Sequence, residues 1–154
     1  MKILISACLL GMPVRYDGQS KGVVSHWLQG LGAEGRLLPF CPEVAGGLPT
    51  PRPPAERQGE HVITQGGKDV TTEFLRGAQL ALALCRQEGI RLALLKEGSP
   101  SCGSGRIYNG QFTGVSMAGE GCTTALLRRH GIDVFSEDQL AQLAERLRQL
   151  QSAG

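Results

Sequence analysis

The chain has 154 residues, of which 41% are apolar and 19% charged, a composition typical of one soluble globular domain rather than a disordered chain. A formal net charge of +2 and an aromatic content of 5% argue against binding nucleic acid through its phosphates or by base stacking. No apolar run approaches the ~18–20 residues that span a bilayer, so the sequence predicts no membrane segment.

The first half of the chain alternates short apolar segments with stretches rich in polar residues, glycine or proline. Apolar, β-prone runs predict buried strands, whereas the Gly/Pro-rich stretches predict loops. In chain order we expect a strand over residues 2–7, a loop over 14–22, a short helix over 26–31, a strand over 36–40 and a loop over 46–58.

A hairpin and a long helix are predicted next. Residues 61–64 and 68–71 flank a glycine turn, which is typical of a small hairpin. Thr71 or Thr72 is expected to cap a helix with one apolar face, and Gly89 is expected to end it.

The second half repeats the alternation of strands and helices. We expect a single α/β domain over residues 1–154, with a three-layer, Rossmann-like fold, a mainly parallel sheet of about four strands and a small β-hairpin. The order of the strands cannot be read from this pattern. The remaining predicted elements are a strand over 90–96, a Gly-rich loop over 98–114, a helix over 118–130, a strand over 132–135 and a last helix capped by Ser136.

Three of the five cysteines follow predicted strands. Cys8 and Cys41 come directly after the first two strands, and Cys102 lies a few residues past the third. Since the carboxyl ends of parallel strands meet at one edge of a sheet, these thiols are expected to converge there. Cys85 is expected in the core. Cys122 is also expected in the core, although the helix dipole at its position could lower its thiol pKa.

Convergent thiols in a chain without an export signal point to a metal centre. The five apolar residues before Cys8 are too few for a signal peptide, so we expect a cytoplasmic protein with reduced thiols rather than disulfides. Three thiolates favour zinc or an iron–sulfur cluster, and spacing alone does not separate the two. A 4Fe–4S cluster held by three cysteines would leave one iron open, as a Lewis-acid catalyst requires.

Long motifs in the chain match those of a known family. The sequence resembles the bacterial thiouracil desulfidase family, a small family of iron–sulfur-dependent enzymes, over nearly its whole length. The motifs that carry the resemblance are Ser6–Gly11, Val14–Gly18, Phe40–Arg52, Leu95–Gly103, Ile107–Gly110 and Gly131–Glu137.

The resemblance implies a cofactor and a reaction. It implies that Cys8, Cys41 and Cys102 hold a 4Fe–4S cluster whose open iron takes the sulfur of a thiolated pyrimidine such as 2-thiouracil. The carbon–sulfur bond would then be hydrolysed without net redox change, with release of sulfide. Related enzymes act on thiouridine in transfer RNA.

Glu43 and Ser101 are the candidate catalytic residues. Glu43, two residues after Cys41, is the expected base that deprotonates water; its alternative role is to cap a helix or to pair with Arg52 or Arg57. Ser101, next to Cys102, is expected to bind the pyrimidine or relay a proton, its alternative being a turn residue. For other edge-loop residues a surface role is favoured over binding of the ring or a ribose phosphate: Arg15, Tyr16, Arg52, Arg106, Tyr108 and Asn109.

Two other functions remain open at this stage. The same three cysteines would suit a zinc- or thiol-dependent enzyme, and the chain could instead be a non-catalytic cluster carrier or an RNA-binding module. The expected partner is a small thiolated pyrimidine, with transfer RNA less favoured, no membrane partner and a monomeric state.

Overall fold

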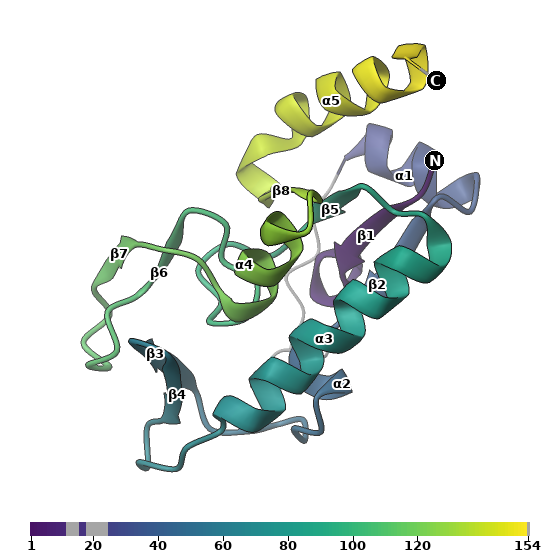
Figure 1. Ribbon diagram of the computed structural model, residues 1–154. Helices are drawn as coiled ribbons and strands as arrows, with labels where there is room; N and C mark the ends of the chain where they lie inside the picture. Colours follow the sequence, from purple (N-terminus) through teal and green to yellow (C-terminus); the bar gives the residue numbers. More distant parts are fainter. Residues whose placement is uncertain (12–15, 18–24, 154) are drawn as a thin grey trace.

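A four-stranded parallel sheet forms the centre of the molecule. The computed structural model describes residues 1–11, 16–17 and 25–153, and its sheet has the strand order β2-β1-β5-β8 (Figure 1). All four predicted strands are present, each somewhat shorter than expected: β1 (Ile3–Ser6), β2 (Leu37–Phe40), β5 (Leu92–Leu94) and β8 (Asp133–Phe135).

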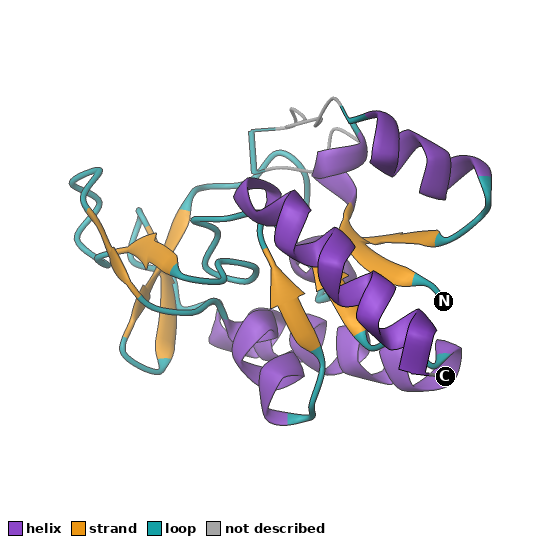
Figure 2. Ribbon diagram, turned by 90° about the horizontal axis from the view of Figure 1, so that it is seen from above, coloured by secondary structure: helices purple, strands orange, loops and turns teal. Residues whose placement is uncertain are grey.

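Helices cover both faces of this sheet, which confirms the three-layer fold. Ile3 and Ile5 on β1 pack with α1 (His26–Ala33) and α5 (Leu140–Ala153), whereas Leu4 faces α3 (Thr71–Glu88) and α4 (Cys122–Arg129). Alternate residues of a strand point to opposite faces, so a strand covered on both sides is apolar throughout. Figure 2 shows the helices on either side of the strands. Within the described ranges, no helix is long and apolar enough to cross a membrane.

Helix ends follow the predicted signals in two of three places. Gly89 ends α3 in the left-handed conformation, and Ser136 forms a capping box with Gln139 at the 3-10 turn η2 (Glu137–Gln139) that leads into α5. The expected threonine cap of α3 is wrong. Thr71 is already the first helical residue, and its hydroxyl accepts the Val62 N–H instead.

Two antiparallel hairpins lie beside the sheet, where the sequence predicted one. The predicted loop over 46–58 ends in strand β3 (Ala55–Gln58), which pairs with β4 (His61–Thr64) across the tight turn at Gly59 and Glu60. The predicted partner of β4, residues 68–71, contributes only an isolated bridge between Ile63 and Asp69. The hairpin prediction is therefore correct for β4 and wrong for its main partner.

The second hairpin begins within the predicted Gly-rich loop over 98–114 and continues beyond it, up to the residue where the sequence predicted a helix to start. Strands β6 (Arg106–Tyr108) and β7 (Ser116–Ala118) pair there, and helix α4 starts only at Cys122 rather than at residue 118. The side chains of β7 are exposed, so the strand lacks the apolar alternation that would have revealed it. Gly121 packs so close to the backbone of Ser101 that a Cβ atom would overlap it, which fixes the start of α4.

Two short helical turns follow the first two strands. After β1 the chain enters the 3-10 helix η1 (Ala7–Leu10), and after β2 it enters α2 (Pro42–Ala45), with Pro42 at the first turn. Both turns were missed because each is only four residues long. The predicted loop over 14–22 falls largely outside the described residues.

Candidate active site

A cavity of about 520 Å³ opens at the carboxyl edge of the sheet, within the ~300–1,000 Å³ range typical of small-molecule sites. One side of its lining comes from the segments that follow β1, β2 and β5, and the other from β3 and from the β6–β7 connection. Parallel sheets bind ligands at this edge because the connecting loops gather there.

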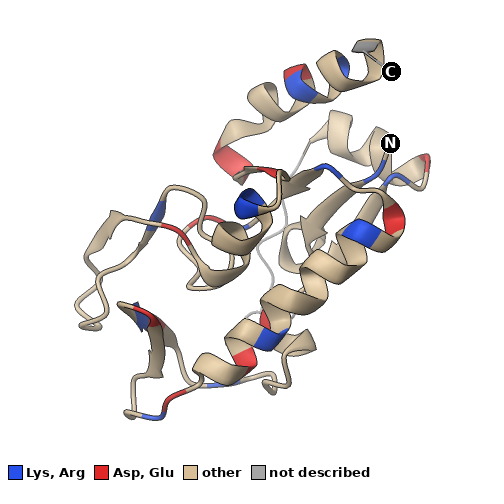
Figure 3. Cartoon of the chain, in the orientation of Figure 1, with Lys and Arg blue, Asp and Glu red and all other residues tan. Residues whose placement is uncertain are grey.

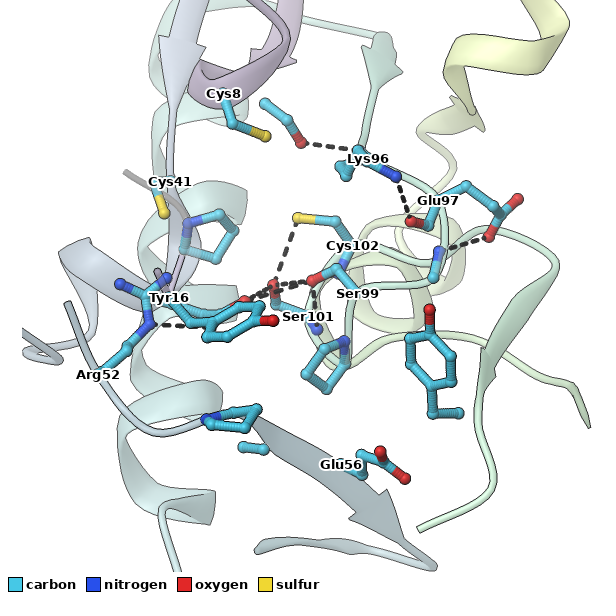
Figure 4. A pocket seen from close by; sticks show the side chains of 18 of the residues that line it. Cys8, Tyr16, Cys41, Arg52, Glu56, Lys96, Glu97, Ser99, Ser101 and Cys102 are labelled. Carbon is cyan, nitrogen blue, oxygen red and sulfur yellow. Dashed lines mark hydrogen bonds and ion pairs between the residues drawn. The ribbon is translucent and has the colours of Figure 1, made fainter. Parts of the chain in front are cut away.

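Three cysteines line this cavity, as the sequence predicted. Cys8 comes from η1, Cys41 is the residue before α2, and Cys102 belongs to the loop after β5. Figure 4 shows their sulfur atoms facing the same space. The arrangement assembles soft ligands from three separate parts of the chain.

The other two cysteines lie in the core, as expected. Burial raises the pKa of the Cys85 thiol to about 11, and Cys85 packs against the sheet from α3. Cys122 packs with Val62, Val70 and Phe74. The pKa of the Cys122 thiol is raised on balance, because burial outweighs the lowering effects of Arg57 and of the backbone at the start of α4.

The three thiols of the cavity are soft ligands of the kind that iron–sulfur clusters and zinc take. Over the described ranges, no group of three or more His, Cys, Asp or Glu side chains is arranged to hold a metal ion. A tetrahedral zinc site, with bonds of ~2.3 Å to sulfur, draws its thiolates together around one point. An iron–sulfur cluster takes its cysteines on separate irons and so accepts sulfurs that stand further apart.

The Cys102 thiol must lose its proton before it can bind a metal or a cluster. Its side chain is 4% exposed, and burial raises its pKa to about 12 although the Ser101 and Ser6 hydroxyls hydrogen-bond to it. Binding of a metal or cluster at this thiol therefore releases a proton.

Glu43 points into the same cavity and is held at both carboxylate oxygens. The Arg52 Nε atom donates to Oε1 at 3.2 Å, and the Ser101 hydroxyl donates to Oε2 at 2.9 Å. The Arg52 and Glu43 side chains are only 5% and 15% exposed, so this ion pair is largely shielded from water. The sequence posed a base and an ion-pair partner of Arg52 as alternatives for Glu43, and the structure contains the ion pair.

A short serine network connects Glu43 to Cys102. The Ser99 and Ser101 hydroxyls lie 2.8 Å apart, and the Ser101 Oγ atom lies 3.4 Å from the Cys102 sulfur. Ser99 Oγ also accepts the backbone N–H groups of Ser101 and Cys102. Ser101 is thus more than a turn residue, since its 1% exposed side chain bridges the carboxylate and the thiol.

Glu97 organises the loop that carries these groups, and the sequence reasoning gave it no role. Its Oε1 atom accepts the backbone N–H groups of Gly98, Ser104, Gly105 and Arg106, and its Oε2 atom accepts the Ser104 hydroxyl. Burial alone would raise the pKa of Glu97, but these hydrogen bonds together lower it. The sequence did hold a signal for this role: Glu97 directly precedes a loop rich in glycine and serine, whose N–H and hydroxyl groups a carboxylate can accept.

Comparison with known proteins shows to which family the chain belongs. The family model described as 2-thiouracil desulfurase matches residues 3–139. The chain belongs to the 2-thiouracil desulfurase family. A solved structure of TudS, described as a [4Fe-4S]-dependent thiouracil desulfidase, is 80% identical, covers 96% of this chain and 97% of that chain, and superposes with a TM-score of 0.95. YbbK of Bacillus subtilis (strain 168), an uncharacterized protein, is 40% identical over an alignment of 148 positions that covers 90% of this chain and 97% of YbbK.

The remaining edge-loop residues of this desulfurase family member divide into two groups. Tyr16, Arg52 and Tyr108 line the cavity, whereas Arg106 and Asn109 do not. Arg15 lies outside the described residues. Arg57, the other proposed partner of Glu43, instead donates to the Glu120 carbonyl oxygen.

Proposed function

We propose that this chain is a [4Fe-4S]-dependent thiouracil desulfidase that hydrolyses the carbon–sulfur bond of a thiolated pyrimidine without net redox change. The observation that carries the proposal is the convergence of three cysteines and the Glu43–Ser101 pair on one cavity. The 80% identity to a [4Fe-4S]-dependent thiouracil desulfidase supports the same activity.

Cys8, Cys41 and Cys102 would hold the cluster in this proposal. When bound by three protein ligands, a 4Fe–4S cluster supplies one open iron, which acts as a Lewis acid toward a thiocarbonyl sulfur. All three thiols line the cavity, and Cys8 and Cys102 are buried, so a cluster held there would be partly shielded from solvent.

Glu43 would take the proton from the attacking water. Each oxygen of an ionised carboxylate has two lone-pair directions, so Glu43 can accept a further hydrogen bond beyond those from Arg52 and Ser101. Arg52 is fixed in turn, because its Nη1 atom donates to the Pro49 carbonyl at 3.1 Å and to the Thr50 hydroxyl at 3.0 Å. The carboxylate is thereby oriented toward the cavity, as general base catalysis requires.

Ser101 would relay or orient that proton. A hydroxyl donates only one hydrogen bond at a time, so Ser101 either donates to Glu43 or turns toward the Cys102 sulfur. The neighbouring Ser99 hydroxyl can donate to Glu43 in place of Ser101, since Ser99 Oγ lies 3.3 Å from Glu43 Oε2.

The net reaction consumes one water and needs no electron donor. The water oxygen bonds to the thiocarbonyl carbon, the carbon–sulfur bond breaks, and sulfur leaves with its electron pair. Both water protons end on sulfide or on solvent bases. The products are the oxo-pyrimidine and hydrogen sulfide.

A small thiolated pyrimidine suits the cavity better than a polynucleotide. The volume of about 520 Å³ matches a heterocyclic base or nucleoside. Acidic and basic residues are interspersed along α3 and α5 (Figure 3), whereas a surface for RNA would gather positive charge. We propose that the protein acts on the small molecule as a monomer.

Turnover in ¹⁸O-labelled water tests this proposal. We expect uracil formed from 2-thiouracil by the anaerobically reconstituted protein to carry one ¹⁸O atom per molecule, with one sulfide released per uracil. Unlabelled uracil, or uracil without sulfide, would contradict hydrolysis. Protein stripped of iron serves as the control for spontaneous reaction.

A further inference from the structure

Phe112, in the β6–β7 connection, has a left-handed backbone conformation that residues with a large side chain rarely adopt. In the described ranges 1–11, 16–17 and 25–153 it is the only residue other than glycine with a positive φ, at 56°. The left-handed region is costly for a bulky residue and free of strain for glycine. Such conformations persist only where the surroundings impose them, and they cluster at functional sites.

A buried carboxylate on the neighbouring hairpin imposes this conformation. Glu56 on β3 is only 9% exposed, and its Oε1 atom accepts the N–H groups of Gly110 at 2.9 Å and of Phe112 at 3.2 Å. The Gln58 side-chain amide donates to the Gly110 carbonyl at 2.8 Å. Gly110 approaches β3 so closely that a Cβ atom would lie 2.6 Å from the Arg57 carbonyl oxygen. The loop is therefore fastened to β3 at Gly110 and at the strained residue itself.

Phe112 lines the same cavity as the three cysteines. Phe112 is half-buried there, and Glu56 lies on the β3 side of the cavity, away from Cys8 (Figure 4). The two tyrosines of the lining, Tyr16 and Tyr108, are more open to solvent, at 40% and 44% exposure. Phe112 thus combines an apolar aromatic face with a backbone that is held rigidly in place.

We infer that Phe112 is the aromatic wall on which the pyrimidine ring stacks, and that Glu56 is the positioning residue that holds it there. The inference rests on the proposed function for the identity of the ring. Stacking on an aromatic side chain suits every planar base and needs no polar partner. It leaves the thiocarbonyl edge of the ring free to meet the cysteines and Glu43.

Ligand affinity and stability of the reconstituted holoprotein test the inference together. We measure the Kd of uracil by anaerobic titration calorimetry and the thermal midpoint of unfolding. Phe112→Ala and Phe112→Gly should both raise the Kd about tenfold, within the ~5- to 150-fold range of base–aromatic stacking, whereas Phe112→Tyr should keep native affinity. Phe112→Gly should be the more stable of the two truncations, by roughly five- to thirtyfold in the unfolding equilibrium constant, because glycine relieves the strain.

The role of Glu56 has its own readout. Glu56→Ala should raise the Kd to the level of Phe112→Ala, Glu56→Gln should restore much of the affinity, and the double alanine variant should bind no more weakly than Phe112→Ala. A merely structural Glu56 would instead give additive losses. Val115→Ala, an exposed change in the same connection, serves as the matched control with native affinity and turnover.

Unchanged Kd values in both Phe112 truncations would overturn the inference, as would a Phe112→Ala variant at least as stable as Phe112→Gly. Failure of the proposed function looks different: the native holoprotein would release no sulfide from 2-thiouracil. If the Phe112 truncations nevertheless lose uracil affinity, the stacking role stands and the reaction must be reassigned.

Discussion

At the scale of single residues, the ion pair between Glu43 and Arg52 is compatible with the catalytic role that we propose for Glu43. The sequence offered helix capping, pairing with arginine or base catalysis as separate roles. In the structure the Arg52 pair holds one carboxylate oxygen while the other faces Ser101. The partner could not be chosen from the sequence, because Arg52 and Arg57 lie at similar distances along the chain.

Glu43→Gln is predicted to separate cluster binding from turnover. The amide has nearly the shape of the carboxylate and can still accept the Ser101 hydrogen bond, but it cannot take a proton from water. We expect full iron and labile-sulfide content with sulfide release reduced by ~10²–10⁴-fold, the usual contribution of general base catalysis. Loss of the cluster in this variant would assign Glu43 a structural role instead.

The five cysteines allow a matched test of cluster ligation. We expect Cys8→Ala, Cys41→Ala and Cys102→Ala each to lose iron and labile sulfide on anaerobic reconstitution, because each removes one of the three ligands that we propose. Cys85→Ala and Cys122→Ala, both buried in the core, should bind the full cluster. A full cluster in any of the first three variants would remove that residue from the ligand set.

At the scale of elements, the parts that the sequence predicted are those with a strong apolar pattern. The four buried strands and α3 were found because their side chains alternate or repeat against a core. The turns η1 and α2 were missed because each is a single helical turn, too short for a helical repeat to show. The strands β3, β6 and β7 were missed because their side chains do not form an apolar run. These short elements nevertheless line much of the cavity. The side formed by β3 and the β6–β7 connection therefore could not be predicted from the sequence.

A close helix crossing positions Cys41 and Glu43. Helix α2 meets α3 where Gly46 and Gly77 have no room for a side chain: a Cβ atom on Gly77 would overlap the Pro42 carbonyl oxygen. Since Pro42 lies between Cys41 and Glu43, any widening of this crossing moves both residues.

Gly77→Ala is predicted to destabilise the protein and to impair the site. Overpacking costs ~1–3 kcal/mol, and the backbone on both sides cannot yield easily, so we expect a loss near 3 kcal/mol in the free energy of unfolding. Denaturant titration measures it, and iron content should fall in the same variant. Gly66→Ala is the control, because that position has no atom within 4 Å and ordinary backbone angles, and it should be within ~0.5 kcal/mol of the native protein. Equal stability of the Gly77→Ala and Gly66→Ala variants would contradict the close packing of Gly77 against Pro42.

At the scale of the whole molecule, the strand order explains why one cavity receives all three cysteines. β2, β1 and β5 are neighbours in the sheet, so the segments that carry Cys41, Cys8 and Cys102 leave it side by side. The rule that parallel strands share one carboxyl edge predicted the convergence, whereas the adjacency of these three strands could not be read from the sequence. The motifs of the family supplied the identity of the metal centre, which residue spacing left open between zinc and iron.

The most direct test of the account counts iron, labile sulfide and turnover on one sample. Protein reconstituted anaerobically is divided between metal analysis and an assay of sulfide released from 2-thiouracil. We predict a 4Fe–4S cluster on each chain, together with sulfide and uracil in equal amounts over many turnovers. A bound cluster without sulfide release, or sulfide release from protein that holds zinc and no cluster, would contradict it.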